Sequence, residues 1–114
     1  MTFADDARDL EELDLLLASP GRPTIEVPVW VVVVDDEVIV RSYTGVGARW
    51  FRRATRHPAQ SVRVGGDTIG VTFEPIESTE AIDDAYDDKY ARFDYVGAMS
   101  KPTAAAATLR VVRR

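Results

Sequence analysis

The spacing of hydrophobic positions changes along the chain. In residues 4–18, apolar residues recur three and four positions apart, which predicts an amphipathic helix that ends at Ser19-Pro20-Gly21. From Ile25 to Val34 the residues are β-branched and extended, and Val29–Val34 is apolar on both faces. This run predicts a strand that is covered on two sides. Pro28 has no N–H to donate to a ladder, so we expect it at a sheet edge or a bulge.

The rest of the chain alternates short strands with short helices. The predicted elements are a turn at Asp35-Asp36-Glu37, a strand at Val38–Tyr43, a helix at Ala48–His57, a hairpin of Ser61–Val64 and Thr68–Phe73 around Gly65-Gly66-Asp67, a helix from Ser78 or Thr79 to about Tyr90, a loop over 94–103 and a strand at Thr108–Val112. Hairpin connections favour antiparallel pairing. The pattern therefore favours a mainly β, α+β fold with about three flanking helices, either a small antiparallel barrel or an α+β sheet, over a doubly wound fold. We expect one domain, residues 1–114, with residues 1–20 as an N-terminal helix packed on it.

Composition excludes several kinds of chemistry. The chain has 114 residues, no cysteine, one histidine and a net charge of −5. It therefore has no disulfide, no thiol nucleophile and no pair of imidazoles, and we expect no metal site. The longest apolar run, Val27–Val34, is too short to cross a bilayer, and the acidic N-terminus is not a secretory signal. These features predict a cytoplasmic protein without a membrane span.

Charge is unevenly distributed. Residues 38–66 contain six arginines and no acidic residue, inside a protein that is acidic overall. Arginine presents a flat fork of donors that matches phosphate and carboxylate groups. An anion-binding site is one reading of this segment, and a solvated helix face is the other. Nucleic acid is the least favoured partner, because the net charge is negative and no reader motif is present.

The candidate site lies where the second strand meets the following helix. Helix N-termini expose free N–H groups that bind anions. The candidate binding residues are Arg41, Ser42, Tyr43, Thr44, Arg49, Trp50 and Arg53. Hydroxyls and guanidinium forks would hold phosphate, and an aromatic ring would stack on a planar ligand. Strand alternation places Arg41 on the face of Ile39 and Tyr43, away from Val40 and Ser42.

Side-chain directions refine this expectation. Arg49 and Arg53 are four residues apart on one helix face, and we expect Arg52 to face elsewhere. Trp50 should pack inward on the barrel beside Phe51 or Ala54. His57 could act as a general base, although a residue at a helix end is the favoured interpretation. Asp83, Asp84, Asp87 and Asp88 are interpreted as a solvated helix face.

Several motifs together resemble a known family. They are Val38-Ile39-Val40-Arg41-Ser42-Tyr43-Thr44-Gly45, Arg49-Trp50-Phe51-Arg52-Arg53-Ala54, His57-Pro58, Val62-Arg63-Val64-Gly65-Gly66, Tyr86-x-x-Lys89-Tyr90 and Thr108-Leu109-Arg110-Val111-Val112. The chain is similar here to a domain-of-unknown-function family, which resembles the deazaflavin-dependent nitroreductases and pyridoxamine-phosphate oxidase, the FMN-binding split β-barrels.

The resemblance implies a split β-barrel, usually a homodimer, with FMN or a deazaflavin between the barrel and the partner subunit. It places the phosphate on Arg41, Ser42 and Thr44, with Arg22, Arg49 and Arg53 as further contacts, and it suggests a flavin- or deazaflavin-dependent reductase or oxidase. The nitroreductases carry Gly-Arg-x-Ser-Gly before the first strand, whereas this chain has Gly21-Arg22-Pro23-Thr24. The alternative is a non-catalytic small-ligand-binding or interaction module on the same fold. The doubly apolar run Val29–Val34 also predicts a homodimer interface.

Overall fold

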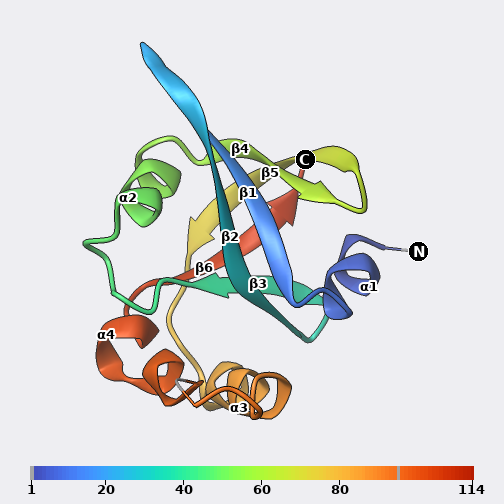
Figure 1. Cartoon of the computed structure of the whole chain (residues 1–114), viewed down its shortest axis with the longest axis vertical. Coiled ribbons are helices and arrows are strands. Elements are labelled where there is room, and N and C mark those ends of the chain that lie inside the picture. Colours follow the sequence, from blue (N-terminus) through green and yellow to red (C-terminus); the bar gives the residue numbers. More distant parts are fainter. Residues whose placement is uncertain (1, 95) are drawn as a thin grey trace.

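Six antiparallel strands form a closed barrel in the computed structural model, which describes residues 2–94 and 96–114. The strands are β1 (Glu12–Ser19), β2 (Arg22–Val34), β3 (Glu37–Arg41), β4 (Ala59–Val64), β5 (Asp67–Pro75) and β6 (Thr108–Arg113). Around the barrel their order is β1-β2-β3-β6-β5-β4. The helices are α1 (Phe3–Arg8), α2 (Arg49–Arg56), α3 (Glu80–Lys89), the 3₁₀ helix η1 (Val96–Ser100) and α4 (Pro102–Ala105) (Figure 1). The predicted mainly β, α+β barrel is confirmed.

The predicted long N-terminal helix is wrong. Helix α1 ends at Arg8, and Glu12–Ser19 is a strand instead. Leu13, Leu15 and Leu17 alternate along β1, and each is fully buried inside the barrel. The leucine run fits both periods, and pairing with two neighbouring strands favours the extended form because it satisfies the backbone of β1 on both edges.

Tight two-residue turns join β1 to β2, β2 to β3 and β4 to β5. Asp35 and Asp36 link β2 to β3 with φ of 50° and 61°, and Gly65 and Gly66 link β4 to β5 with φ of 56° and 91°. Positive φ at both central positions is the mark of the turns that suit a twisted hairpin. The predicted polar turn and glycine hairpin are therefore confirmed. Pro20-Gly21, predicted to end a helix, instead turns β1 into β2.

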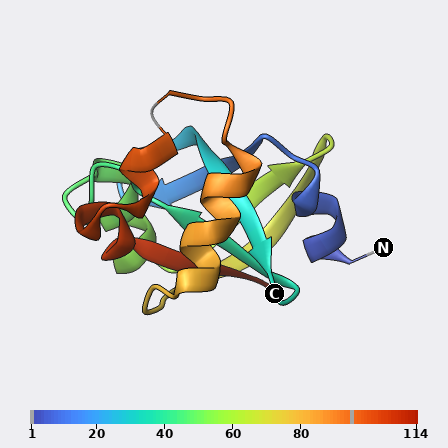
Figure 2. The ribbon, with the colours of Figure 1, turned by 90° about the horizontal axis from the view of Figure 1, so that it is seen from below.

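The two faces of the barrel wall have different cores. Inward-facing residues of all six strands fill the barrel, among them Val31, Val40 and Phe73. Outward-facing Val32 and Ile39 pack under α3 against Ile82, Tyr86 and Tyr90. Figure 2 shows α3 lying across the outside of the barrel. The double apolar character of the central strand is thus explained within one chain.

This packing removes the sequence argument for a dimer. On the outer face of Val29–Val34, Val32 is buried under α3, and the ring of Trp30 stacks on that of Tyr90 at 4.1 Å. Packing within one chain therefore accounts for the apolar residues of this face, and no second subunit is needed to explain them. The homodimer stays a prediction that rests on the family resemblance. Pro28 pairs only with β1, since β3 joins β2 from Val31 onward, and its predicted edge position is confirmed.

The segment after α3 is more ordered than predicted. Residues 96–100 and 102–105 form η1 and α4 where the sequence predicted a loop, so the described residues contain four α-helices where about three were predicted. Met99 of η1 is buried against the core under α3. No helix in the described part of the chain is long and apolar enough to span a membrane.

Tyr90 and Tyr86 should make the fold sensitive to alkali. The Tyr90 hydroxyl bonds the N–H of Val31 at 2.9 Å and the carbonyl of Glu11 at 2.6 Å. Burial raises the pKa of Tyr90 to about 12, and burial also raises the pKa of Tyr86. A raised pKa favours the neutral phenol in the folded state, so its contribution to stability is complete below pH 10 and is lost as the pH rises toward 12.

The check is chemical denaturation of wild type and Tyr90→Phe between pH 8 and 11.5. We expect the wild type to lose more stability than the variant above about pH 10, because the variant has no phenol to ionise. Comparing the two proteins removes the contribution of every group they share. Parallel curves across this range would contradict the prediction.

Candidate functional site

The structure divides the predicted binding residues among three places. Arg41 lies beneath α3, Tyr43 and Thr44 lie on the surface loop after β3, and Arg49 and Arg53 lie on α2. Arg41 shares a face with Ile39, as predicted, and Val40 points into the barrel. The predicted binding residues are close together in the sequence, but the structure does not bring them together in one site.

Arg41 is enclosed by the protein itself. Its side chain is fully buried, and its guanidinium pairs with Asp83 at 2.7 Å. It also donates to the Thr108 hydroxyl at 2.9 Å, the Met99 carbonyl at 2.6 Å and the Ser78 hydroxyl. These bonds join β3 to α3, η1 and β6. Arg41 thus acts as a structural cross-link here, and Asp83 is its partner rather than part of a purely solvated face.

The loop from Ser42 to Gly47 presents its groups elsewhere. Ser42 is buried, and its hydroxyl lies 3.2 Å from that of Thr44. Gly45 has φ of 91° and lies so close to Thr103 of α4 that a Cβ would clash. This loop is thereby fixed against α4. Tyr43 is 67% exposed and lines an apolar pocket of about 490 Å³. That pocket is lined by Glu12, Pro28, Trp30, Tyr43, Ala98 and Met99.

The arginines of α2 gather in a different pocket. It has a volume of about 360 Å³, and we call it the arginine pocket. It is lined by Ser19, Arg22, Ile25, Arg49, Arg52, Arg53, Arg56 and His57. One wall comes from the tip of the β1–β2 hairpin, which projects beyond the barrel, and the other from α2 (Figure 1). Of the described residues that line it, none is acidic.

The sequence places these cations together through helix geometry. Positions 49, 52, 53 and 56 are three and four residues apart, so they share one face of α2. The opposite face carries Phe51 and Ala54, which are buried against the barrel and hold the helix in place. The expectation that Arg52 faces away from Arg49 and Arg53 is wrong, because a separation of three residues also returns to the same face.

Trp50 is intermediate between the two faces. It is partly buried against the barrel core, and its ring meets that of Phe51 edge-on at 5.9 Å. The predicted inward packing beside Phe51 is confirmed. Trp50 is not among the residues that line the arginine pocket, so it offers no stacking surface there.

The start of α2 also suits an anion. Its N-cap is Ala48, whose methyl group cannot accept a hydrogen bond, and no acidic residue lies in the first turn. The first N–H groups of the helix therefore lack the side-chain cap that Ser, Thr, Asp or Asn would give. With Arg49 in that first turn, the partial positive charge of the helix end adds to the field of the arginines.

The guanidiniums of the pocket differ in how they are held. Arg53 donates through Nη1 to the carbonyls of Leu17 at 3.1 Å and Pro23 at 3.0 Å, and so ties α2 to both strands of the hairpin. Within the described residues, Arg22, Arg49, Arg52 and Arg56 have no ion pair or side-chain hydrogen bond. Most of the positive charge is thus available to a ligand.

His57 and Gln60 support the far end of the pocket. His57 is the C-cap of α2, and its N–H bonds the carbonyl of Arg53 at 2.9 Å. The buried amide of Gln60 donates to the His57 and Ala18 carbonyls and accepts the Ala18 N–H at 2.8 Å. The favoured helix-end interpretation of His57 is confirmed, and its ring also lines the pocket. Sequence reasoning missed the roles of Ser19 and Gln60, because neither lies in a recognisable motif.

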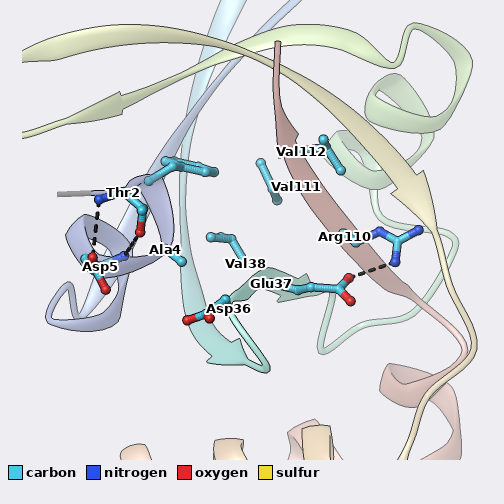
Figure 3. Close-up of a pocket in the computed structure, with 10 residues that line it drawn as sticks. Thr2, Ala4, Asp5, Asp36, Glu37, Val38, Arg110, Val111 and Val112 are labelled. Carbon is cyan, nitrogen blue, oxygen red and sulfur yellow. Dashed lines mark hydrogen bonds and ion pairs between the residues drawn. The ribbon is translucent and has the colours of Figure 1, made fainter.

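A second hollow is a poor anion site by comparison. It has a volume of about 450 Å³ and lies between α1, the β2–β3 turn and β6 (Figure 3). Asp5, Asp36 and Glu37 line it, and Arg110, the one cation among its described lining residues, is already paired with Glu37 at 2.7 Å and Glu74 at 2.8 Å. The carboxylates of Glu37 and Glu74 raise the pKa of Arg110. The guanidinium stays charged, but the two carboxylates balance its charge and leave none in excess for an anionic ligand.

Solved structures share the fold at low sequence identity. The conserved hypothetical protein Rv2991 from Mycobacterium tuberculosis has a TM-score of 0.71 and 18% identity, over 100% of this chain and 81% of that one. HutZ, the heme storage protein from Vibrio cholerae, has a TM-score of 0.69 and 13% identity, over 96% of this chain and 86% of that one. The predicted split barrel is thereby confirmed.

Family comparison agrees with the resemblance seen in the motifs. A search of curated proteins finds no significant match. A family model described as an uncharacterised protein conserved in bacteria (DUF2255) matches residues 8–111, which cover β1 to β5, the first part of β6 and almost all of the chain. The chain therefore belongs to this bacterial family.

Proposed function

We propose that this protein binds a small phosphate-bearing ligand, with the phosphate in the arginine pocket. The observation that carries the proposal is five guanidinium groups around a pocket of about 360 Å³ that has no acidic residue among its described lining. Bonds between guanidinium and phosphate are charge-assisted and about twice as strong as neutral ones. The Ser19 hydroxyl adds a neutral donor on the hairpin side.

Flavin mononucleotide and a deazaflavin are the first candidates, because the split-barrel fold is shared with flavin-binding proteins. The donor set fits their phosphate. It does not supply a slot for the flavin ring, since Ile25 is the one apolar side chain in the described lining of this pocket. The ring would have to extend beyond the arginine pocket, and we assign no reaction step to it. We thus propose ligand binding and no reaction. Both an oxidoreductase and a non-catalytic binding module are compatible with this proposal.

Heme is a second candidate, favoured by one further observation. The sole histidine of the chain lines the same pocket as the arginines, and neutral imidazole is a common ligand of heme iron. The split-barrel relative HutZ is described as a heme storage protein. The pocket has few apolar side chains, so it suits a charged phosphate better than the large apolar ring of a porphyrin.

The proposal is tested by titrating the protein with FMN and with riboflavin, which lacks the phosphate. We expect FMN to bind more tightly than riboflavin, and Arg49→Gln and Arg52→Gln each to weaken FMN binding by roughly ten- to a hundred-fold. The reason is that one charge-assisted hydrogen bond contributes about 1.5–3 kcal/mol. A deazaflavin and hemin are titrated in parallel by absorbance.

Arg113→Gln is the matched control. Arg113 is exposed at the end of β6 and does not line the arginine pocket. Its substitution therefore removes the same single positive charge as the other two variants, but outside the pocket. Equal losses of FMN affinity in all three variants would show that only the overall charge matters. Equal affinity for FMN and riboflavin would remove the phosphate from the pocket.

A further inference from the structure

The amount of positive charge in the arginine pocket exceeds what one phosphate group needs. A phosphate monoester carries a charge of about −1.5 to −2 at neutral pH. The pocket holds Arg22, Arg49, Arg52, Arg53 and Arg56, and only Arg53 is engaged by other groups of the described chain. We infer that the ligand is a linear polyanion with two or more consecutive phosphate groups. This inference rests on the proposed function, for which FMN then serves as a probe with one phosphate, and it specifies the ligand class.

The shape of the cationic surface supports the same class. Arg49 and Arg56 are seven residues apart on α2, which at the α-helical rise is about 10 Å along the helix axis. Arg52 and Arg53 lie between them on the same face. A single phosphate group is shorter than this row and can contact only part of it. A chain of phosphates lying along α2 reaches successive guanidiniums.

The hairpin tip supplies the opposite wall. Ser19 and Arg22 flank the Pro20-Gly21 turn that joins β1 to β2, and they line the pocket across from α2. Arg53 fixes this turn to the helix through the carbonyls of Leu17 and Pro23. A polyanion between the two walls would therefore be contacted from both sides.

Electrostatic repulsion gives the physical reason. Guanidiniums closer together than the Debye length, about 8 Å at physiological salt, repel one another with little screening. Each phosphate that enters offsets part of that repulsion and gains charge-assisted bonds of its own. A second phosphate then meets arginines that the first leaves unpaired, so affinity should rise steeply with the number of phosphates.

The experiment is calorimetric titration of the whole chain with orthophosphate, pyrophosphate and tripolyphosphate at one pH and one ionic strength. We expect Kd to fall by about tenfold or more with each added phosphate. In Arg22→Gln, on the hairpin wall, and Arg56→Gln, at the C-terminal end of the row on α2, we expect the gain from orthophosphate to pyrophosphate to shrink. Arg113→Gln should keep the full gain, and thermal melts confirm that each variant is folded.

Three outcomes would overturn the inference, and they are distinguishable. If the protein binds neither FMN nor any of the three anions, the proposed function is overturned as well. Equal affinity for orthophosphate and pyrophosphate would leave the proposed function standing and reject the polyanion. A single-stranded DNA oligonucleotide that binds and is not displaced by tripolyphosphate would assign the surface to nucleic acid instead.

Discussion

Replacing Arg41 with methionine lowers the free energy of unfolding by about 3 kcal/mol. Removing one partner of a buried ion pair typically costs about 3–5 kcal/mol. We expect the lower end, because the Asp83 side chain is 35% exposed and water can solvate it once its partner is lost. The Met99 carbonyl and the Thr108 hydroxyl each lose a hydrogen bond in the buried region under α3.

Urea denaturation of Arg41→Met beside wild type measures this loss. Arg113→Met is the control, since Arg113 is exposed at the end of β6 and the same substitution there should change stability by less than about 0.5 kcal/mol. The variant also tests the site, because Arg41 does not line the arginine pocket. If Arg41→Met is folded but no longer binds phosphate, Arg41 contacts the ligand, as the sequence analysis predicted.

Truncating Leu15 to alanine costs about 2–5 kcal/mol, the usual range for a leucine removed from a packed core. Leu15 is fully buried in the barrel and pairs with Val27 on one side and Val62 on the other. Leu16, its neighbour, is only partly buried on the outer face. We therefore expect Leu16→Ala to cost clearly less.

The contrast between the two variants also separates the strand from the helix that the sequence predicted. On that helix, Leu10, Leu13, Leu16 and Leu17 are three and four positions apart and would form the core-facing stripe, whereas Leu15 would lie on the opposite face. Thermal or urea unfolding of both variants gives the answer, and a larger loss for Leu16→Ala would contradict the strand register.

The order of elements from β2 to α3 follows from local sequence. The β-branched run of β2, the Asp35-Asp36 and Gly65-Gly66 turns and the Thr79 cap of α3 all appear where the pattern predicts them. Each depends on interactions within a few residues, such as a positive φ or the bond from the Thr79 hydroxyl to the Ile82 N–H. Short-range chemistry of this kind can be read from sequence.

Tertiary structure decided what local pattern left open. The leucines of β1 fit a helix or a strand, and only pairing with β2 and β4 selected the strand. Arg41 and Arg49 lie in one acid-free segment, yet Asp83 of α3, 42 positions away along the chain, captures the first and leaves the second to the pocket. Ser19 and Arg22 join α2 because the hairpin folds over it. The sequence by itself determined the strands from β2 onward, their turns and the amphipathic character of α2, whereas long-range packing determined the strand form of β1 and which cations remain free to bind a ligand.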